Sequence, residues 1–216
     1  MLLTKFGHSC VRISDGDKAL AIDPGVFSEV ETALDGVDAV LITHEHPDHI
    51  DAKRLADQAA ANPALRLWAP QAVATQLAAD PVLADRVSAV EAGASFGAGG
   101  FGIRTFGGQH ALIHSSIPVV ANVAYSIEDV VYHPGDSYTV PTVPVEVALI
   151  PLHAPWAKLA EAMDFAVALR APRAVGIHDA LLAPAGLAMY RDRIASIGAA
   201  HGSDFCALTP GESLSL

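Results

Sequence analysis

The chain has 216 residues, of which 51% are hydrophobic and 17% charged, and its formal net charge is −11. This length fits one globular domain, residues 1–216, and a surface of this sign repels phosphate backbones, so we expect no nucleic acid as a partner. Only two cysteines, Cys10 and Cys206, are present, and no apolar run has the length of a membrane span or the form of a signal peptide. We therefore expect a cytoplasmic protein without a disulfide framework or membrane contact.

Short apolar runs alternate with helical patterns along the whole chain. In chain order, the pattern predicts strands at Leu2–Phe6, Cys10–Ile13, Ala19–Ile22, Ala39–Thr43, Leu65–Trp68, Arg86–Val90, Ile103–Phe106, Val119–Ile127, Val130–Tyr132, Val145–Ile150, Ala174–Ile177 and Phe205–Leu208. It predicts helices at Asp51–Ala61, Gln71–Ala79, Trp156–Leu169 and Ala183–Ala199. The glycine-rich segment Gly93–Gly100 is expected to be a flexible connection between strands, too short and too central to separate two domains.

Each half of the chain passes from strands into helices, which predicts an α/β protein. Two strand-rich halves with helices outside would form a four-layer αββα sandwich. The same alternation also fits a doubly wound parallel sheet, so the pattern alone leaves both arrangements open.

Three of the ten histidines fall within six residues, in the run His44-x-His46-x-Asp48-His49. This run follows a predicted strand and precedes a predicted helix. In an extended segment His44 and His46 share one face and can bind one metal ion. The proline between His46 and Asp48 then turns the chain, so that Asp48 and His49 can reach a second ion. A surface loop has little use for so dense a cluster, and we therefore predict a two-metal site.

Further ligands are expected where later strands end, because a sheet gathers distant strand ends at one edge. His110, Asp136 and His178 each follow a predicted strand. The carboxylate of Asp136 can bridge two cations, which a histidine cannot do. His114 competes with His110 for the third ligand position, and the two glycines before His110 favour His110 because they let the backbone approach a metal closely.

With this order of ligands, the sequence resembles the metallo-β-lactamase-fold superfamily. The match runs along nearly the whole chain and includes Phe6–Ile13 and Ala21–Gly25, which resemble the family's first hairpin. Within the superfamily the chain is most similar to short, cytoplasmic, metal-dependent hydrolases related to ascorbate-6-phosphate lactonase, through Gly107–Ala111 and the lack of appended domains. The resemblance implies an αββα sandwich with its site along one edge of the two sheets.

The resemblance also implies a role for each ligand and a reaction. The expected cofactors are two divalent metal ions, Zn²⁺ or alternatively Mn²⁺. Together they would lower the pKa of a shared water, and the resulting hydroxide would attack a small ester, lactone or phosphoester substrate while an aspartate orients it. The first metal would be held by His44, His46 and His110, the second by Asp48, His49 and His178, with Asp136 bridging both and Asp48 as the orienting aspartate.

Six further residues are candidates for supporting the ligands or lining the substrate pocket: His8, Asp23, His133, Tyr138, His153 and Trp156. Asp23 ends a predicted strand and would either fix a histidine tautomer or cap the following turn. The loop that carries His153 and Trp156 would form a pocket wall with Tyr138, or Trp156 would only pack. The candidate cations for a charged substrate are Arg12, Arg104 and Lys158, and the sequence does not choose between them.

Other functions fit parts of this pattern. The net charge opposes a nuclease or phosphodiesterase of the same fold, and His46 opposes a di-iron protein of the fold, because such proteins place Glu there. A thioester hydrolase of the glyoxalase II type has a Thr-Pro-Gly-His approach to its third histidine, which this chain lacks. The alternative to an enzyme is a non-catalytic metal-binding module. The mean hydropathy of +0.35 leads us to expect surface buried in a homo-oligomer.

Overall fold

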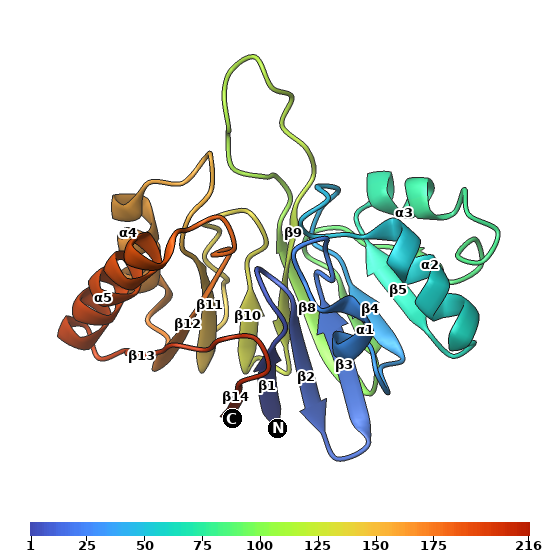
Figure 1. The fold of residues 1–216 in the computed structure, drawn as a ribbon, viewed down its shortest axis with the longest axis horizontal. Helices are drawn as coiled ribbons and strands as arrows, with labels where there is room; N and C mark the ends of the chain where they lie inside the picture. The colour runs from blue at the N-terminus through green and yellow to red at the C-terminus, as the bar shows by residue number, and fades with distance from the viewer.

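The computed structural model describes residues 1–216, which form four layers (Figure 1). Two seven-stranded sheets lie at the centre, in the orders β14-β1-β2-β3-β4-β5-β6 and β13-β12-β11-β10-β9-β8-β7. The first sheet consists of β1 Leu2–Lys5, β2 Val11–Asp15, β3 Lys18–Ile22, β4 Ala39–Leu41, β5 Arg66–Ala69, β6 Val87–Ala89 and β14 Ser213–Ser215. The second consists of β7 Ser95–Ala98, β8 Phe101–Gly107, β9 Val123–Ile127, β10 Val131–His133, β11 Val147–Pro151, β12 Arg173–Ile177 and β13 Asp204–Cys206.

Helices cover the outer face of each sheet, so the predicted αββα sandwich is confirmed. On the first sheet lie α1 Val30–Ala33, α2 Ala52–Ala61 and α3 Gln71–Leu77, and on the second lie α4 Leu159–Leu169 and α5 Pro184–Ala200. None of these helices is long and apolar enough to cross a membrane.

Three apolar layers fill the spaces between the four structural layers. They form because successive side chains of a strand point to opposite faces of its sheet. In β4, Ala39 and Leu41 pack between the sheets, whereas Val40 packs against the helices of the first sheet. In β11, Leu149 packs between the sheets and Ile150 against α4 and α5. Strands buried on both faces are apolar at every position, which explains why they appear in the sequence as continuous apolar runs.

The structure corrects several predicted elements. Gly93–Gly100 contains β7, which pairs antiparallel with β8 through a turn in which Gly99 and Gly100 have φ of +56° and +81°. Glycine is needed at these two positions because the turn is left-handed, and the segment is not a flexible connection. Strand β9 begins at Val123, because the residues from Val119 onward belong to a long loop. The short elements α1 and β14 were not predicted, and α4 begins at Leu159 and not at Trp156.

The topology brings the strand ends that precede the predicted ligands to one edge. Strands β3 and β4 run parallel in the first sheet, and β10, β11 and β12 run parallel in the second. Strand β8 runs in the same direction as β10, because both are antiparallel to the β9 strand between them. The loops that follow these strands lie at the top of Figure 1.

Candidate metal centre

Two sets of metal-binding side chains meet at this edge. Within each set the nitrogen and oxygen atoms available for coordination lie within 4.8 Å of one another. One set consists of His44, His46, His110 and Asp136, and the other of His8, Asp48, His49 and His178. All seven ligands predicted from the sequence therefore lie in these sets, and His8 is an additional member.

Asp136 lies between the two sets. Its Oδ1 is 3.0 Å from His49 Nε2, and its Oδ2 is 3.3 Å from His110 Nε2 and 3.1 Å from His178 Nε2. Thus its two oxygens face histidines of both sets. A carboxylate in this position is suited to bridging two cations.

The residues around Asp136 fix its orientation. The Trp156 indole Nε1 donates a 2.9 Å hydrogen bond to Oδ2, and the Asp136 backbone N–H donates to Asn122 Oδ1 at 3.0 Å. Gly135 has φ of +62°, and a Cβ atom there would lie 2.2 Å from Asn122 Oδ1, so only glycine fits this turn. His133 is fully buried, and its Nδ1 accepts the Gly135 N–H.

Asp23 and Thr43 orient two of the ligand histidines. His49 Nδ1 donates to Asp23 Oδ2 at 2.7 Å, which directs His49 Nε2 to the side of the metal site. The Thr43 backbone N–H and hydroxyl donate to Asp23 at 2.8 and 2.7 Å. Because this hydroxyl has donated its proton, it accepts from His44 Nδ1 at 3.0 Å and leaves His44 Nε2 free.

Backbone carbonyls orient two more histidines in the same way. His110 Nδ1 donates to Ala111 O at 2.6 Å, and His178 Nδ1 donates to His153 O at 2.6 Å. Both rings therefore direct Nε2 towards the site. His153 contributes through its carbonyl, while its ring Nδ1 lies 3.4 Å from the Tyr190 hydroxyl.

His8 supports Asp48. Its Nδ1 accepts the Ala180 backbone N–H at 3.3 Å, so its Nε2 carries the proton and donates to Asp48 Oδ2 at 3.2 Å. The ring is 4.0 Å from the ring of His178 and makes an edge contact with Phe27. In this tautomer His8 positions a ligand and does not itself offer a lone pair to a metal.

The site is held in a strained backbone. His8, Asp23 and His178 have φ of +47°, +51° and +56°, a region that side-chain-bearing residues rarely adopt. The His178 N–H donates to His8 O at 3.1 Å, so two of these strained turns stabilise each other. Strain of this kind persists only where the surrounding contacts enforce it, and it is concentrated at functional sites.

Burial and neighbouring charges shift the pKa values of the ligands in different directions. Burial lowers the pKa of His44 well below its ordinary value, and the neighbouring His49 lowers it further. Burial alone would also lower the pKa of His178, but the adjacent carboxylates of Asp136 and Asp48 together outweigh burial and raise that pKa to about 9. Burial would raise the pKa of Asp136, yet His49 and the other histidines hold it well below its usual range.

These atoms fit a pair of divalent metal ions. Four buried atoms, Nε2 of His49, His110 and His178 and Oδ1 of Asp136, have no hydrogen-bond partner although they converge on the same space. A buried polar atom without a partner is costly, and a cation would satisfy all four. Five imidazoles with two carboxylates form a donor set that suits zinc.

Other predicted residues lie farther from the ligands. His114 belongs to neither set and is exposed on a loop, where its Nδ1 contacts the Ser116 hydroxyl. Tyr138 packs on Trp156 and Phe165 with ring centres 5.1 Å apart in both cases. Thr43 and Asn122, which orient the site, were not identified from the sequence because single hydroxyl and amide residues carry no recognisable spacing.

The chain matches the family model of the beta-lactamase superfamily domain over residues 2–178, a span that includes every predicted ligand. Protein Rv0786c of Mycobacterium tuberculosis is 40% identical over 199 residues, which cover 90% of this chain and 91% of that protein. A UPF0173 metal-dependent hydrolase of Xanthobacter autotrophicus is 34% identical over 119 residues, 51% of this chain and 49% of the relative.

Among solved structures, Igni18, a novel metallo hydrolase from Ignicoccus hospitalis, has a TM-score of 0.74 at 21% identity, over 99% of this chain and 97% of that one. This likeness concerns the fold. The narrower resemblance to relatives of ascorbate-6-phosphate lactonase stays a prediction. The family match covers most of the chain and agrees with the four-layer architecture, and the chain therefore belongs to the metallo-β-lactamase superfamily.

Proposed function

We propose that this protein uses two divalent metal ions, preferably Zn²⁺, to hydrolyse a small ester, lactone or phosphoester. The chain is a metal-dependent hydrolase by its family and by relatives that carry this name. The observation that carries the two-metal proposal is the position of Asp136, whose oxygens face histidines of both ligand sets at 3.0 to 3.3 Å.

When bound, the two ions would supply a water of lowered pKa and an electrophile for the substrate oxygen. The chain's own residues supply orientation and proton handling. Asp136 is 4% exposed, which suits a bridging ligand, whereas Asp48 is 21% exposed. The Asp48 carboxylate is therefore the one accessible to a water from solvent. With its Oδ2 held by His8, Asp48 can orient that water and accept its proton.

The donor set also bears on the choice of metal. His46 stands at a position where an acidic residue would favour iron, and its Nδ1 lies 3.1 Å from His44 Nε2. Imidazole ligands in place of a carboxylate favour zinc, with manganese as the alternative.

Metal analysis and a substrate panel test the proposal. Freshly purified protein should contain about two zinc ions per chain and should hydrolyse at least one of a lactone, a carboxylic ester and a phosphodiester. His46→Ala should lose metal and activity while its circular dichroism spectrum stays that of a folded protein. Hydrolysis by chelator-treated protein at the original rate would contradict the proposal, as would bound iron with oxygen-consuming activity.

A further inference from the structure

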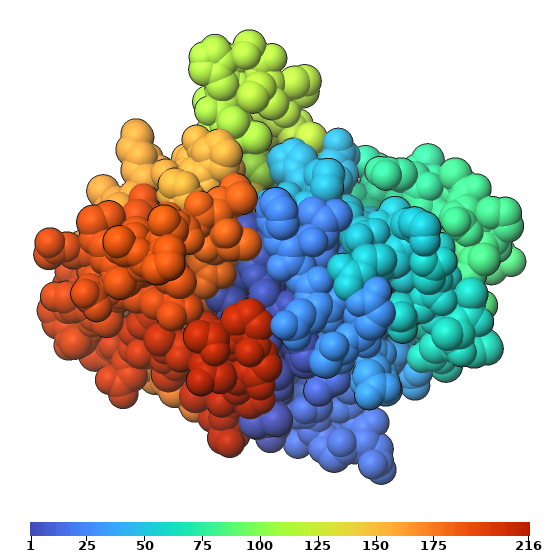
Figure 2. Space-filling view, in the orientation of Figure 1, coloured from blue at the N-terminus to red at the C-terminus, as the bar shows by residue number.

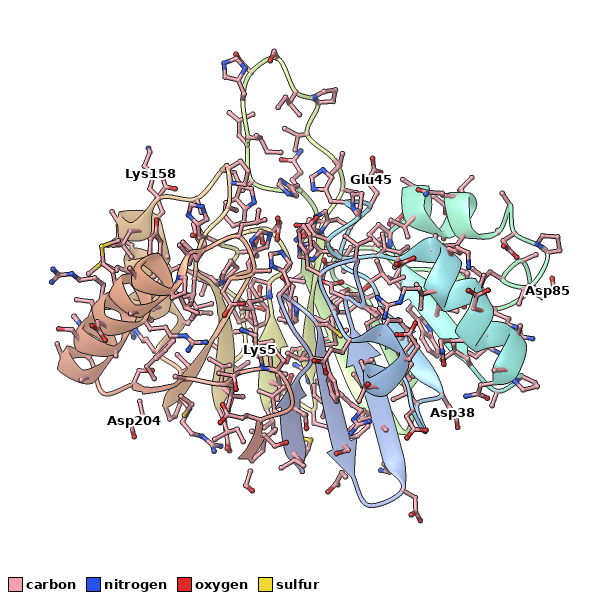
Figure 3. The ribbon with its side chains drawn as sticks, in the orientation of Figure 1. Lys5, Asp38, Glu45, Asp85, Lys158 and Asp204 are labelled. Carbon is pink, nitrogen blue, oxygen red and sulfur yellow. The ribbon has the colours of Figure 1, made fainter.

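The loops around the metal centre carry almost no positive charge. Six segments form this edge, with residue ranges 23–29, 43–51, 108–122, 134–144, 152–158 and 178–183. Of the 13 Lys and Arg residues in the chain, only Lys158 lies in these segments. The acidic residues there include the exposed Glu45, and Figure 3 shows Glu45 and Lys158 at this upper edge. A site that selects anionic substrates is expected to present cations, and this edge has one.

Two basic residues that contact the 178–183 segment are already engaged. Lys5 is 1% exposed and its Nζ donates to Asp179 at 2.6 Å and to Gly176 O at 2.9 Å. Arg191 donates to Leu208 O at 3.0 Å and faces the same Asp179. These side chains brace the segment that follows His178 and are not available to a ligand.

The other candidate cations for an anionic substrate are also directed elsewhere. Arg12 donates to the carbonyls of Thr32 and Asp35 and lies over the Phe6 ring. Arg104 pairs with Asp129 at 3.4 Å. Lys158 pairs with Glu161 at 3.3 Å across one turn of α4, but this exposed pair is weak, so Lys158 is the one cation that needs an experimental test.

Exposed apolar side chains are concentrated at the same edge. The chain has nine exposed large hydrophobic residues, and seven of them lie in these segments. They are Val26, Phe27, Val140 and Leu181, together with three residues of the 108–122 segment. Single exposed hydrophobic residues are ordinary, but their concentration around one centre marks a binding surface.

Two of these residues border the more accessible part of the metal centre. The Phe27 ring contacts the ring of His8 at 5.4 Å, and the Nδ1 of His8 accepts the N–H of Ala180, the neighbour of Leu181. His8 in turn holds Asp48. Phe27, at 45% exposure, therefore contacts the ring that holds Asp48, and Leu181, at 56%, follows the residue bonded to that same ring.

The other part of the centre is bordered by uncharged residues. An open cavity of about 610 Å³ beside His110 is lined by Phe106, Thr139, Val140 and other residues of which none is acidic or basic apart from the histidine. The 108–122 segment, which contributes Gln109 and His110 to the cavity lining, projects from the molecule as an arm, as Figures 1 and 2 show. The arm contains no Asp, Glu, Lys or Arg.

We infer that the substrate is uncharged and carries an apolar group that packs against Phe27 and Leu181, as in a neutral ester or lactone with a hydrocarbon chain. This inference rests on the proposed function and narrows it, because a phosphoester or a carboxylate-bearing substrate would find only Lys158 as a cationic side chain at the edge. In the balanced reaction, water adds to the acyl carbon, the bond from that carbon to the ester oxygen breaks, and the products are a carboxylic acid and an alcohol.

A matched pair of chromogenic esters tests the inference on the zinc-loaded protein. The p-nitrophenyl ester of hexanoic acid and the mono-p-nitrophenyl ester of adipic acid have acyl chains of equal length and differ in a terminal carboxylate. We expect kcat/KM to be at least tenfold higher for the hexanoate. It should also rise from acetate to hexanoate, towards the limit of about fourfold per fully buried methylene group.

Single substitutions test which side chains contact the hydrocarbon chain of the substrate. Leu181→Ala and Phe27→Ala should raise KM for the hexanoate several-fold more than KM for the acetate, with the zinc content unchanged. Met189→Ala is the matched control, because Met189 is 49% exposed but lies on α5 outside these segments. Lys158→Ala should leave the hexanoate kinetics unchanged.

The outcomes separate this inference from the proposed function. If the adipate monoester is hydrolysed as fast as the hexanoate, or if a preference for it is lost in Lys158→Ala, the inference is wrong and the hydrolase proposal stands. If Leu181→Ala and Phe27→Ala dissociate an oligomer without changing either KM, the apolar surface joins copies of the chain and the inference is again wrong. If a phosphodiester is hydrolysed but no ester or lactone is, the inference is wrong and the hydrolase proposal stands. If none of the three is hydrolysed, both proposals fail.

Discussion

The ligand histidines differ in which group fixes the far side of the ring. Carbonyl oxygens accept from His110 and His178, a hydroxyl accepts from His44, and a buried carboxylate accepts from His49. Only His49 has a full negative charge behind it, from Asp23. A charged acceptor makes the ligand nitrogen more basic and holds its tautomer more firmly, so Asp23 is the residue outside the ligand sets whose loss should be felt most.

Replacing Asp23 with Asn should lower the affinity for zinc by about 10- to 100-fold without removing a ligand. Both Asp23 oxygens accept hydrogen bonds from Thr43, and Oδ2 also accepts from His49. An amide offers one acceptor and one donor, so either His49 or Thr43 loses its partner. Competition with a chromogenic chelator measures the effect, and Asp57→Asn, at an exposed ion pair, is the control. Equal zinc affinity in Asp23→Asn and the original protein would show that Asp23 does not support metal binding.

The protonation of His178 predicts how metal binding depends on pH. In the metal-free protein its pKa is raised to about 9, so at pH 7 the ring holds a proton that a metal ion must displace. Affinity should therefore fall as pH falls below 9, by up to tenfold per unit for each proton displaced. Calorimetric titration at pH 7 in buffers of different ionisation enthalpy should show at least one proton released. Binding without proton release would show that His178 is neutral in the metal-free protein.

At the scale of elements, the turn after β3 supports the loop after β4. The Val26 N–H donates to Pro47 O, and the Asp51 N–H donates to Pro24 O, so backbone bonds join the two segments on both sides of Asp48. Between them Gly25 lies so close that an added Cβ would be 2.0 Å from Asp48 O and 2.5 Å from His49 N. The absence of a side chain at Gly25 thus sets the position of two ligands.

Gly25→Ala should therefore separate these two segments and weaken metal binding, although residue 25 touches no metal. Backbone atoms cannot rotate away as a side chain can, so the whole ligand loop must move. Zinc affinity and the urea midpoint should both decrease. Gly97→Ala is a matched control, because Gly97 has no positive φ and a Cβ there would meet only Phe101 O at 3.9 Å. If both variants behave alike, the close approach at Gly25 is not what positions the loop.

The elements also show what the sequence can and cannot predict. Helix α2 was predicted within a few residues because it has a periodic apolar pattern, and strand β11 because it is a continuous apolar run. Strand β7 was missed because its glycines serve a tight turn and resemble a linker. The arm was partly taken for a strand because Val119 and Val120 are apolar and β-branched, and only the tertiary structure shows that they face no sheet.

Across the whole molecule, the ligands could be predicted because metal chemistry restricts residue types and spacing. The residues that orient the ligands could not be predicted. The bonds of Trp156 to Asp136 and of His8 to Asp48 join residues 20 and 40 positions apart, and no local pattern encodes either pair. The apolar rim is likewise invisible in the sequence, since its segments are separated by tens of residues and share only their place at one edge.

Each ligand set takes residues from both sheets, so bound metal ions would link the two halves. His44 and His46 follow β4 of the first sheet, whereas His110 and Asp136 follow β8 and β10 of the second. A ligand that binds only the folded state stabilises it by about 2.7 kcal/mol when its free concentration is 100 times its dissociation constant. Chelation should therefore lower the urea midpoint of unfolding, and added zinc should restore it. His46→Ala, which lacks a first-set ligand, should respond less to zinc. A midpoint that is the same with chelator and with zinc would mean that zinc does not bind the folded chain in preference to the unfolded one, which would contradict the metal centre.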